Sequence, residues 1–406
     1  MKIALVVPTL EPGGVETFVL NLSRYCLHMG HDVEVVVTES PGEWFSLFQD
    51  AGLKTVCLER QASFSSVTHA LRVGKWLREQ AYDVVFLNHA RHAQAVVGML
   101  PASSKVIPIV HNDDPEVYRV ACSNSRCWGT AVATSRRVAE VTAERLPNHK
   151  LYQIEQGIDV PALPRDVQGE EPSGQLRVLY VGRLFDRQKG VLLIPDIVRE
   201  ARQAGITLHM TIVGSGPDAE SLRMKVEQFG LGEIFTFWDG RDHDEVLDVM
   251  RRHHVLLMPS HYEGFGIVAL EAQAQGCVPI ANRLPGATEL SIAHGVSGFL
   301  VEDQQLSEYV TFLKSVYEDP ALWRQLSVNG YHRVAERFST EAMGAAYLAV
   351  AEETPVFDAS QWRGHPVSLD LSLFGWRDYL PNTLKASVKR LLGGGRARAS
   401  RPANVS

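Results

Sequence analysis

The sequence predicts an α/β protein built from two doubly wound parallel sheets that face each other across a cleft. First, short apolar runs of strand length alternate with helical patterns in both halves of the chain. Second, a stretch from Pro161 to Gly174 is rich in Pro, Gly and acidic residues and has no periodic apolar pattern. Third, 406 residues are too many for one ordinary core and suit two domains of about 150 to 200 residues each.

The first half opens with a strand, a glycine loop and a helix. The apolar run at residues 3–7 ends at Pro8, and a Gly13–Gly14 turn then precedes a helical pattern over 16–29. Further strands are expected at residues 32–38, 84–87, 106–110 and 131–134. Because continuous apolar strands that alternate with helices form parallel sheets covered on both faces, residues 1–162 are predicted to form a Rossmann-like domain.

The second half repeats this pattern after a linker predicted at residues 163–175. Its strands are expected at residues 177–181, 208–213, 234–238, 255–258, 278–281 and 298–301. A helical pattern over 306–351 follows, so residues 176–350 are predicted to form a second Rossmann-like domain. Two such sheets place the loops after their strands on a shared cleft, where ligands bind.

Residues 351–406 are predicted to form an extension with a basic tail. Its aromatic residues are expected to dock on a domain surface: Trp362, Phe374, Trp376 and Tyr379. From Pro381 to the end there are six basic residues and no acidic ones, and a helix over 383–392 would carry a short apolar stripe. This favours weak binding to the inner face of an anionic membrane, and the alternative is a solvated terminus.

Composition and charge exclude several classes of protein. The chain has 40 basic and 47 acidic residues, and its formal net charge of -7 argues against nucleic acid as a main partner. Its five cysteines include no Cys-x-x-Cys pair, so neither a disulfide framework nor a zinc site is indicated. The opening apolar run is too short for a signal peptide and no run of about 20 apolar residues occurs, so a cytoplasmic protein is expected.

The segment from Glu263 to Ala272 is the most informative one, because it follows the strand expected at 255–258. Its glycines let the backbone approach a ligand closely, and a helix from Ile267 would point free amides and a positive dipole end at an anion. Glu263 could hold sugar hydroxyls, and Glu271 could accept hydrogen bonds from a ribose diol. The alternative makes Glu263 a turn residue and Glu271 a surface charge.

Two cations follow the first strand of the second half. Arg183 and Lys189 lie on one short loop, where they could bind a diphosphate and stabilise its charge as it departs. The alternative is that both are solvated surface charges. Their place at the carboxyl end of a strand favours the diphosphate interpretation.

The chain carries five motifs in the following order: Gly13-Gly14-Val15-Glu16, Gly157-Ile158-Asp159, the Arg183 and Lys189 pair, Val213-Gly214-Ser215-Gly216-Pro217, and Glu263 to Ala272. This order resembles that of the retaining glycosyltransferases of the GT-B fold, the large family that includes sucrose synthases and bacterial mannosyltransferases. The likeness spans roughly residues 1 to 350.

The resemblance implies a role for most of these residues. Arg183 and Lys189 would bind the diphosphate of a nucleotide-sugar donor, and Glu271 would bind its ribose. The transferred sugar and its phosphate would contact Glu263 and the backbone amides of Gly264, Phe265, Gly266 and Ile267.

The resemblance also implies roles in the first domain, which would lie on the acceptor side. Gly13 and Gly14 would approach the donor from the opposite wall of the cleft. His111 matches the histidine that contacts the donor sugar near the reacting centre, and a purely structural histidine is the alternative. His89 and His92 follow a strand end and could line an acceptor pocket, although a structural role is favoured for both.

No metal and no cofactor are expected beyond the nucleotide-diphosphate sugar, which is a co-substrate. Asp242-His243-Asp244 resembles the Asp-x-Asp of metal-dependent glycosyltransferases, yet Asp242 followed by Glu245 is typical of a helix capping box. The family resemblance implies retention of anomeric configuration. Because the sequence offers no clear carboxylate for double displacement, attack on the same face is favoured, with the leaving phosphate taking the proton of the acceptor.

The predicted function is transfer of a sugar from a nucleotide-diphosphate sugar to a hydroxyl acceptor, such as a lipid-linked or envelope glycan precursor. Two alternatives remain open. One is a sugar-nucleotide 2-epimerase of the same fold, and the other is a carbohydrate-binding protein without catalytic activity.

Overall fold

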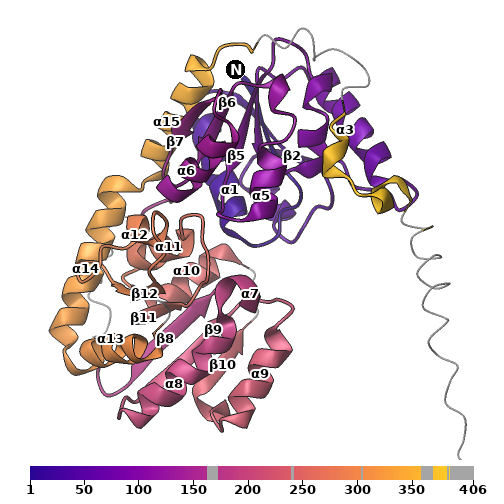
Figure 1. Cartoon of the computed structure of the whole chain (residues 1–406). Coiled ribbons are helices and arrows are strands. Elements are labelled where there is room, and N and C mark those ends of the chain that lie inside the picture. The colour runs from indigo at the N-terminus through magenta and orange to yellow at the C-terminus, as the bar shows by residue number, and fades with distance from the viewer. Residues whose placement is uncertain (162–171, 239–241, 303–304, 358–368, 382–383, 385–406) are drawn as a thin grey trace, which may run out of the picture.

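The computed structural model describes residues 1–161, 172–238, 242–302, 305–357, 369–381 and 384. These residues form two parallel β-sheets, one of seven and one of six strands, and each lies in its own helix-covered body (Figure 1). The predicted fold class, two Rossmann-like doubly wound domains, is confirmed.

The first sheet has the strand order β3-β2-β1-β4-β5-β6-β7. Its strands are β1 (Lys2–Val7), β2 (Asp32–Val37), β3 (Lys54–Cys57), β4 (Val84–Asn88), β5 (Lys105–Val110), β6 (Thr130–Ala133) and β7 (Lys150–Gln153). Ile3 and Leu5 of β1 pack in one core, whereas Ala4 and Val6 pack in another on the opposite face. Both faces are therefore buried, and this is why the inner strands are continuously apolar.

The helices of the first domain are α1 (Gly14–His28), α2 (Phe45–Asp50), α3 (Ser66–Gln80), α4 (Arg91–Ala95), α5 (Pro115–Ala121) and α6 (Arg136–Arg145). The sequence analysis does not predict β3 and β7, which are the two edge strands. Each has only four residues, and none of these residues is fully buried. The apolar run that marks an inner strand is therefore missing from both.

The second sheet has the strand order β10-β9-β8-β11-β12-β13. Its strands are β8 (Leu176–Val181), β9 (Leu208–Val213), β10 (Phe235–Trp238), β11 (Val255–Met258), β12 (Val278–Asn282) and β13 (Phe299–Val301). Its helices are α7 (Asp186–Lys189), α8 (Ile194–Gln203), α9 (Ala219–Gln228), α10 (His243–Arg251), α11 (Ile267–Ala274), α12 (Thr288–Ser291) and α13 (Leu306–Glu318). Val178 and Leu179 of β8 pack in different cores, so this sheet is also buried on both faces.

Two segments that connect the domains, near Ile158 and near Phe338, lie side by side in the described part of the chain. The amide of Ile158 donates to the carbonyl oxygen of Phe338 at 2.9 Å, and the amide of Thr340 donates to that of Ile158 at 3.0 Å. The second of these segments joins α14 (Pro320–Arg337) to α15 (Thr340–Glu353), and α15 lies on the first domain (Figure 1).

Helix α15 packs in the core of the first sheet. The ring of Tyr347 lies 5.1 Å from that of Phe18 and 5.9 Å from that of Phe86. The boundary expected at residue 350 groups this helix with the second domain. An amphipathic pattern shows that a helix packs against something, but it does not show which sheet it packs against. The packing of α15 on the first domain therefore cannot be predicted from its sequence.

The described part of the C-terminal extension docks on α3 and α4. Leu373 and Phe374 are buried in a small core with Ala70 and Val96. Trp376 and Tyr379 remain 67% and 47% exposed, so they do not dock as expected. Trp362 and most of the predicted basic tail lie outside the described residues.

Within the part of the chain that the structure describes, no helix combines the length and the apolarity that crossing a membrane requires.

Candidate active site

The loop after β11 carries the predicted phosphate-binding segment. Gly266 has a φ of 88°, in the left-handed region that favours glycine, and α11 begins at the next residue, Ile267. Phe265 anchors the loop, because its buried ring packs 5.6 Å from that of Phe338. No side chain of the described residues caps α11, so its first amides are available to an anion.

One close backbone approach and one side-chain contact join the domains at this loop. A Cβ atom on Gly264 would lie 1.6 Å from the carbonyl oxygen of His111, so only glycine permits the contact. A Cβ atom on Gly14, at the start of α1, would lie 3.5 Å from Cδ1 of Ile267. Gly13 directly precedes α1. The structure therefore brings Gly14 and His111 of the first domain to the loop and the first residue of α11, with Gly13 next to Gly14 in the chain.

Glu263 is buried and held by two donors. Its Oε1 accepts hydrogen bonds from Lys189 Nζ at 2.6 Å and from Ser260 Oγ at 2.7 Å. The close approach of the Lys189 loop to β11 depends on Gly190, whose φ is 60° and whose added Cβ would lie 2.2 Å from the carbonyl oxygen of Pro259. Lys189 and Glu263 are both predicted site residues, but their contact is not evident from the sequence. Ser260 is not predicted, and only its place after β11 could have indicated it.

Arg183 follows β8 at the same edge of the sheet, with an exposed side chain. Its guanidinium carbon lies 5.7 Å from the centre of the Phe185 ring, and its carbonyl oxygen accepts a hydrogen bond from the Tyr180 hydroxyl at 2.9 Å. Among the described residues the guanidinium has no ion-pair partner. Its backbone is thus fixed while its charge is available to a ligand.

His111 is buried, and its protonation state follows from its contacts. Asn88 donates from Nδ2 to the carbonyl oxygen of Val6 at 3.3 Å, so its Oδ1 faces His111 Nε2 at 2.8 Å. An amide oxygen can only accept, so Nε2 carries the proton. Burial, with a smaller contribution from nearby His89, lowers the pKa of His111 to about 3. The imidazole is therefore neutral, and Nδ1 can accept a hydrogen bond.

Asn88, the last residue of β4, is not among the predicted site residues. Its position could have indicated it, because ligands bind at the carboxyl ends of parallel strands. Strands β4 and β5 are neighbours and His111 directly follows β5, so Asn88 and His111 lie at the same edge of the sheet.

Glu271 lies in α11 and is paired with a histidine from the neighbouring helix. Its Oε1 lies 3.0 Å from Nε2 of His243, the first residue of α10. Burial opposes protonation of this imidazole, but the hydrogen bond and charge of Glu271, with the charges of Asp244 and Asp242, outweigh it and raise the pKa of His243.

Asp242 acts as the expected helix cap, since its Oδ1 accepts from the amide of Asp244 at 2.8 Å and from that of Glu245 at 3.3 Å.

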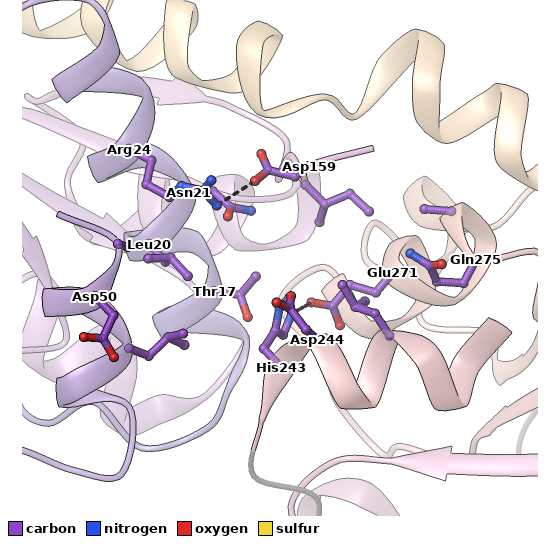
Figure 2. Close-up of a pocket in the computed structure, with 15 residues that line it drawn as sticks. Thr17, Leu20, Asn21, Arg24, Asp50, Asp159, His243, Asp244, Glu271 and Gln275 are labelled. Carbon is purple, nitrogen blue, oxygen red and sulfur yellow. Dashed lines mark hydrogen bonds and ion pairs between the residues drawn. The ribbon is translucent and has the colours of Figure 1, made fainter. Parts of the chain in front are cut away.

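A cavity of about 340 Å³ lies between the domains beside Glu271 (Figure 2). Thr17, Asn21 and Arg24 of α1 line one wall, and His243 and Glu271 line the other. The cavity is therefore continuous with the Glu271 end of the site, whereas Lys189 and Arg183 do not line it.

A second cavity, of about 350 Å³, adjoins Glu263 and is also lined by both domains. Its polar lining comes from Asp113, Arg136, Arg137 and Glu140 of the first domain and from His261, Tyr262 and Glu263 of the second. This cavity cannot be identified from the sequence, because it forms only where the two domains face each other.

His89 and His92, the two histidines considered for an acceptor pocket, differ in burial. His92 is fully buried, 4.9 Å from the ring of His69, and its Nδ1 lies 3.0 Å from Oε1 of Glu39. His89 is half-buried with a positive φ of 54°. The favoured structural role agrees with the burial of His92 under Phe374.

Comparison with known proteins agrees with this architecture. Residues 12–161 match the model of glycosyltransferase family 4, and residues 165–333 match that of glycosyl transferases group 1. The D-inositol 3-phosphate glycosyltransferase of an Arthrobacter species is 33% identical over 154 residues, which are 37% of this chain and only 36% of that protein. The enzyme of that name from Segniliparus rotundus is 27% identical over 324 residues, 74% of this chain and 68% of that protein.

Solved structures show the same fold. The structure of Anabaena HepE in complex with UDP and glucose covers 87% of this chain and 99% of that one, with a TM-score of 0.72 and 19% identity. The two family models together match most of both domains, including the loops that follow β8 and β11. The chain therefore belongs to the glycosyltransferases of the GT-B fold.

Proposed function

We propose that the chain transfers a sugar from a nucleoside-diphosphate sugar to a hydroxyl acceptor, with retention of anomeric configuration and without a divalent metal ion. The observation that carries this proposal is the convergence of Gly14 and His111 with the loop from Glu263 to Ile267 at the start of α11. The UDP complex of the HepE structure supports a nucleotide-sugar donor.

Stabilisation of the leaving diphosphate is the main task of the site in this proposal. As the bond from the anomeric carbon to the phosphate oxygen breaks, negative charge grows on the diphosphate. The amides at the start of α11 and the Arg183 guanidinium are available to that charge, and the Lys189 ammonium has two further N–H groups beside the one that it donates to Glu263. Glu271 binds the ribose.

His111 acts as a hydrogen-bond acceptor and not as a general acid. With a pKa of about 3, the His111 imidazole is neutral at neutral pH and has no second proton to give to the leaving group. Its one proton, on Nε2, is already donated to Oδ1 of Asn88. Its Nδ1 can accept a hydrogen bond from a hydroxyl of the donor sugar, which holds the sugar over the diphosphate.

Retention by attack on the same face is favoured over double displacement. The Glu263 carboxylate is hydrogen-bonded to Lys189 and Ser260, which orients it to bind and makes it a weak nucleophile. In the favoured step the acceptor oxygen bonds to the anomeric carbon while the phosphate leaves, and the acceptor proton passes to the leaving phosphate oxygen.

A hydroxyl of a lipid-linked or envelope glycan precursor is our proposed acceptor. The cavity beside Glu263 lies next to the proposed sugar position and is lined by both domains, which supports entry of an acceptor there. The name of the curated relatives, D-inositol 3-phosphate glycosyltransferase, supplies a second acceptor to test.

A donor panel tests the function. UDP-, GDP- and ADP-sugars are incubated with the full chain and with either a lipid-linked acceptor or an inositol phosphate, and the products are followed by NMR. Transfer with the anomeric configuration of the donor supports the proposal. Epimerised donor without transfer would favour the 2-epimerase, and binding without turnover would favour a carbohydrate-binding protein.

Metal independence is a separate prediction. Transfer should survive EDTA, because cations and helix amides supply the positive charge that a metal ion provides elsewhere. The measurement is the initial rate before and after chelation. Complete loss of activity with rescue by Mn²⁺ or Mg²⁺ would instead favour a role for Asp242 and Asp244.

We further propose that the protein works in the cytoplasm, bound weakly to the inner face of a membrane. Trp376, Tyr379 and Leu384 are exposed in the described part of the extension, just before a sequence with six basic and no acidic residues. Anionic lipids attract such a segment by about 1 kcal/mol per cation near the surface.

Flotation with anionic liposomes tests this proposal. The full chain should float at low salt and be released at high salt, and a chain cut after Leu380 should not float. Equal partitioning of the full-length and truncated chains would contradict the proposal.

A further inference from the structure

His243 is fixed on three sides at the edge of the cavity beside Glu271. Its backbone begins α10, where Asp242 accepts two amide hydrogen bonds and so holds the first turn in place. Its ring packs against the indole of Trp44 from the other domain, with ring centroids 5.5 Å apart and an interplanar angle of 77°. Its third contact is the carboxylate of Glu271.

The bond between His243 and Glu271 has a defined direction. An ionised carboxylate only accepts, so Nε2 of His243 donates to Oε1 over 3.0 Å. The side chains are only 22% and 11% exposed, so few water molecules can compete for this hydrogen bond. The bond from His243 therefore fixes the plane of the two Glu271 oxygens.

A carboxylate that binds a ribose diol must present its remaining lone pairs to two hydroxyls at once. Figure 2 shows the His243 and Glu271 side chains directed toward each other at the wall of the cavity, with Thr17 of α1 across from them. Rotation of the carboxylate about its last bond would misdirect these lone pairs, and the hydrogen bond from His243 opposes that rotation.

We infer that His243 is a positioning residue of the donor site, which orients Glu271 toward the ribose diol and so sets the preference for ribonucleotides over 2′-deoxyribonucleotides. This inference rests on the proposed function, in which Glu271 binds the ribose. The competing interpretation is that the pair only links α10 to α11 and has no part in recognition.

Nucleotide binding to the full chain distinguishes the two interpretations. Isothermal titration calorimetry gives the Kd of UDP and of 2′-deoxy-UDP, or of the corresponding ADP or GDP pair if the wild type prefers that base. The wild type should bind the ribonucleotide about tenfold more tightly, because the site loses a charged hydrogen bond with the 2′-hydroxyl. His243→Ala should lose most of this ratio, whereas His243→Gln, which retains an N–H donor, should keep most of it.

His209→Ala is the matched control. His209 donates or accepts one hydrogen bond to Thr236 within the same domain, at 2.9 Å, and lines neither cavity. This variant should keep the wild-type ratio. Glu271→Gln should lose the ratio, and adding His243→Ala to it should cause little further loss, because the two side chains act as one unit.

The outcomes separate this inference from the proposed function. A wild-type ratio in His243→Ala, or an equal loss in His243→Gln and His243→Ala, overturns the positioning role while leaving the proposed function intact. If no nucleoside diphosphate binds the wild type at millimolar concentration, the proposed function itself fails and the inference fails with it.

Discussion

Replacing Lys189 by Ala should lower kcat for transfer by about 10² to 10³, and Arg183→Ala should lower it by a similar factor. In the proposed mechanism both cations interact more strongly with the departing diphosphate than with the bound donor, so their loss should raise the barrier. Lys189→Ala also removes the 2.6 Å hydrogen bond that orients Glu263. Initial rates over a range of donor concentrations separate kcat from KM.

Lys225→Ala is the matched control for this experiment. Lys225 also pairs with a carboxylate of the second domain, at 2.5 Å from Asp196, but it lines neither cavity. Its removal should leave kcat unchanged. Near-normal turnover in both Lys189→Ala and Arg183→Ala would contradict the assignment of the diphosphate site.

Gly264→Ala should reduce kcat/KM by about 10² or more, because a displacement of about 1 Å at a reacting centre can cost that much. The added Cβ would lie 1.6 Å from the carbonyl oxygen of His111, so the two domains must separate at the point where the sugar is proposed to bind. Each sheet retains its own core, so the thermal unfolding temperature should change little.

Gly232→Ala controls for the loss of a glycine as such, since an added Cβ there meets nothing within 4 Å. It should leave both kcat/KM and Tm close to wild type. If Gly264→Ala were as active as Gly232→Ala, the contact between Gly264 and His111 would be irrelevant to catalysis.

The sequence predicts the inner strands well because burial on both faces makes them continuously apolar. Residues 255–258 are predicted as a strand and form β11 with the same bounds. The edge strand β3 fails this test because its residues are half exposed. A strand of four residues that is only partly buried has too few apolar positions to be recognised from the sequence.

The site also has residues that can be predicted from the sequence and contacts that cannot. Residues on the loops after strands can be found from the sequence, because a parallel sheet gathers the ends of its strands at one edge. Lys189 and Glu263 are such residues, yet they are 74 positions apart and their hydrogen bond depends on how close the two loops lie. His243 escapes detection for a different reason, since the sequence assigns its neighbours to a helix cap and gives no sign that its ring turns toward Glu271.

The paired crossings near Ile158 and Phe338 also determine how the two halves of the enzyme can move. Because these two segments are hydrogen-bonded to each other, a rotation of one domain relative to the other would have to bend both of them together. Such a rotation would carry Gly264 away from His111. Helix α15 holds the second segment against the first domain through the buried ring of Tyr347, so a chain shortened before α15 would lose this link between the domains as well as part of the first core.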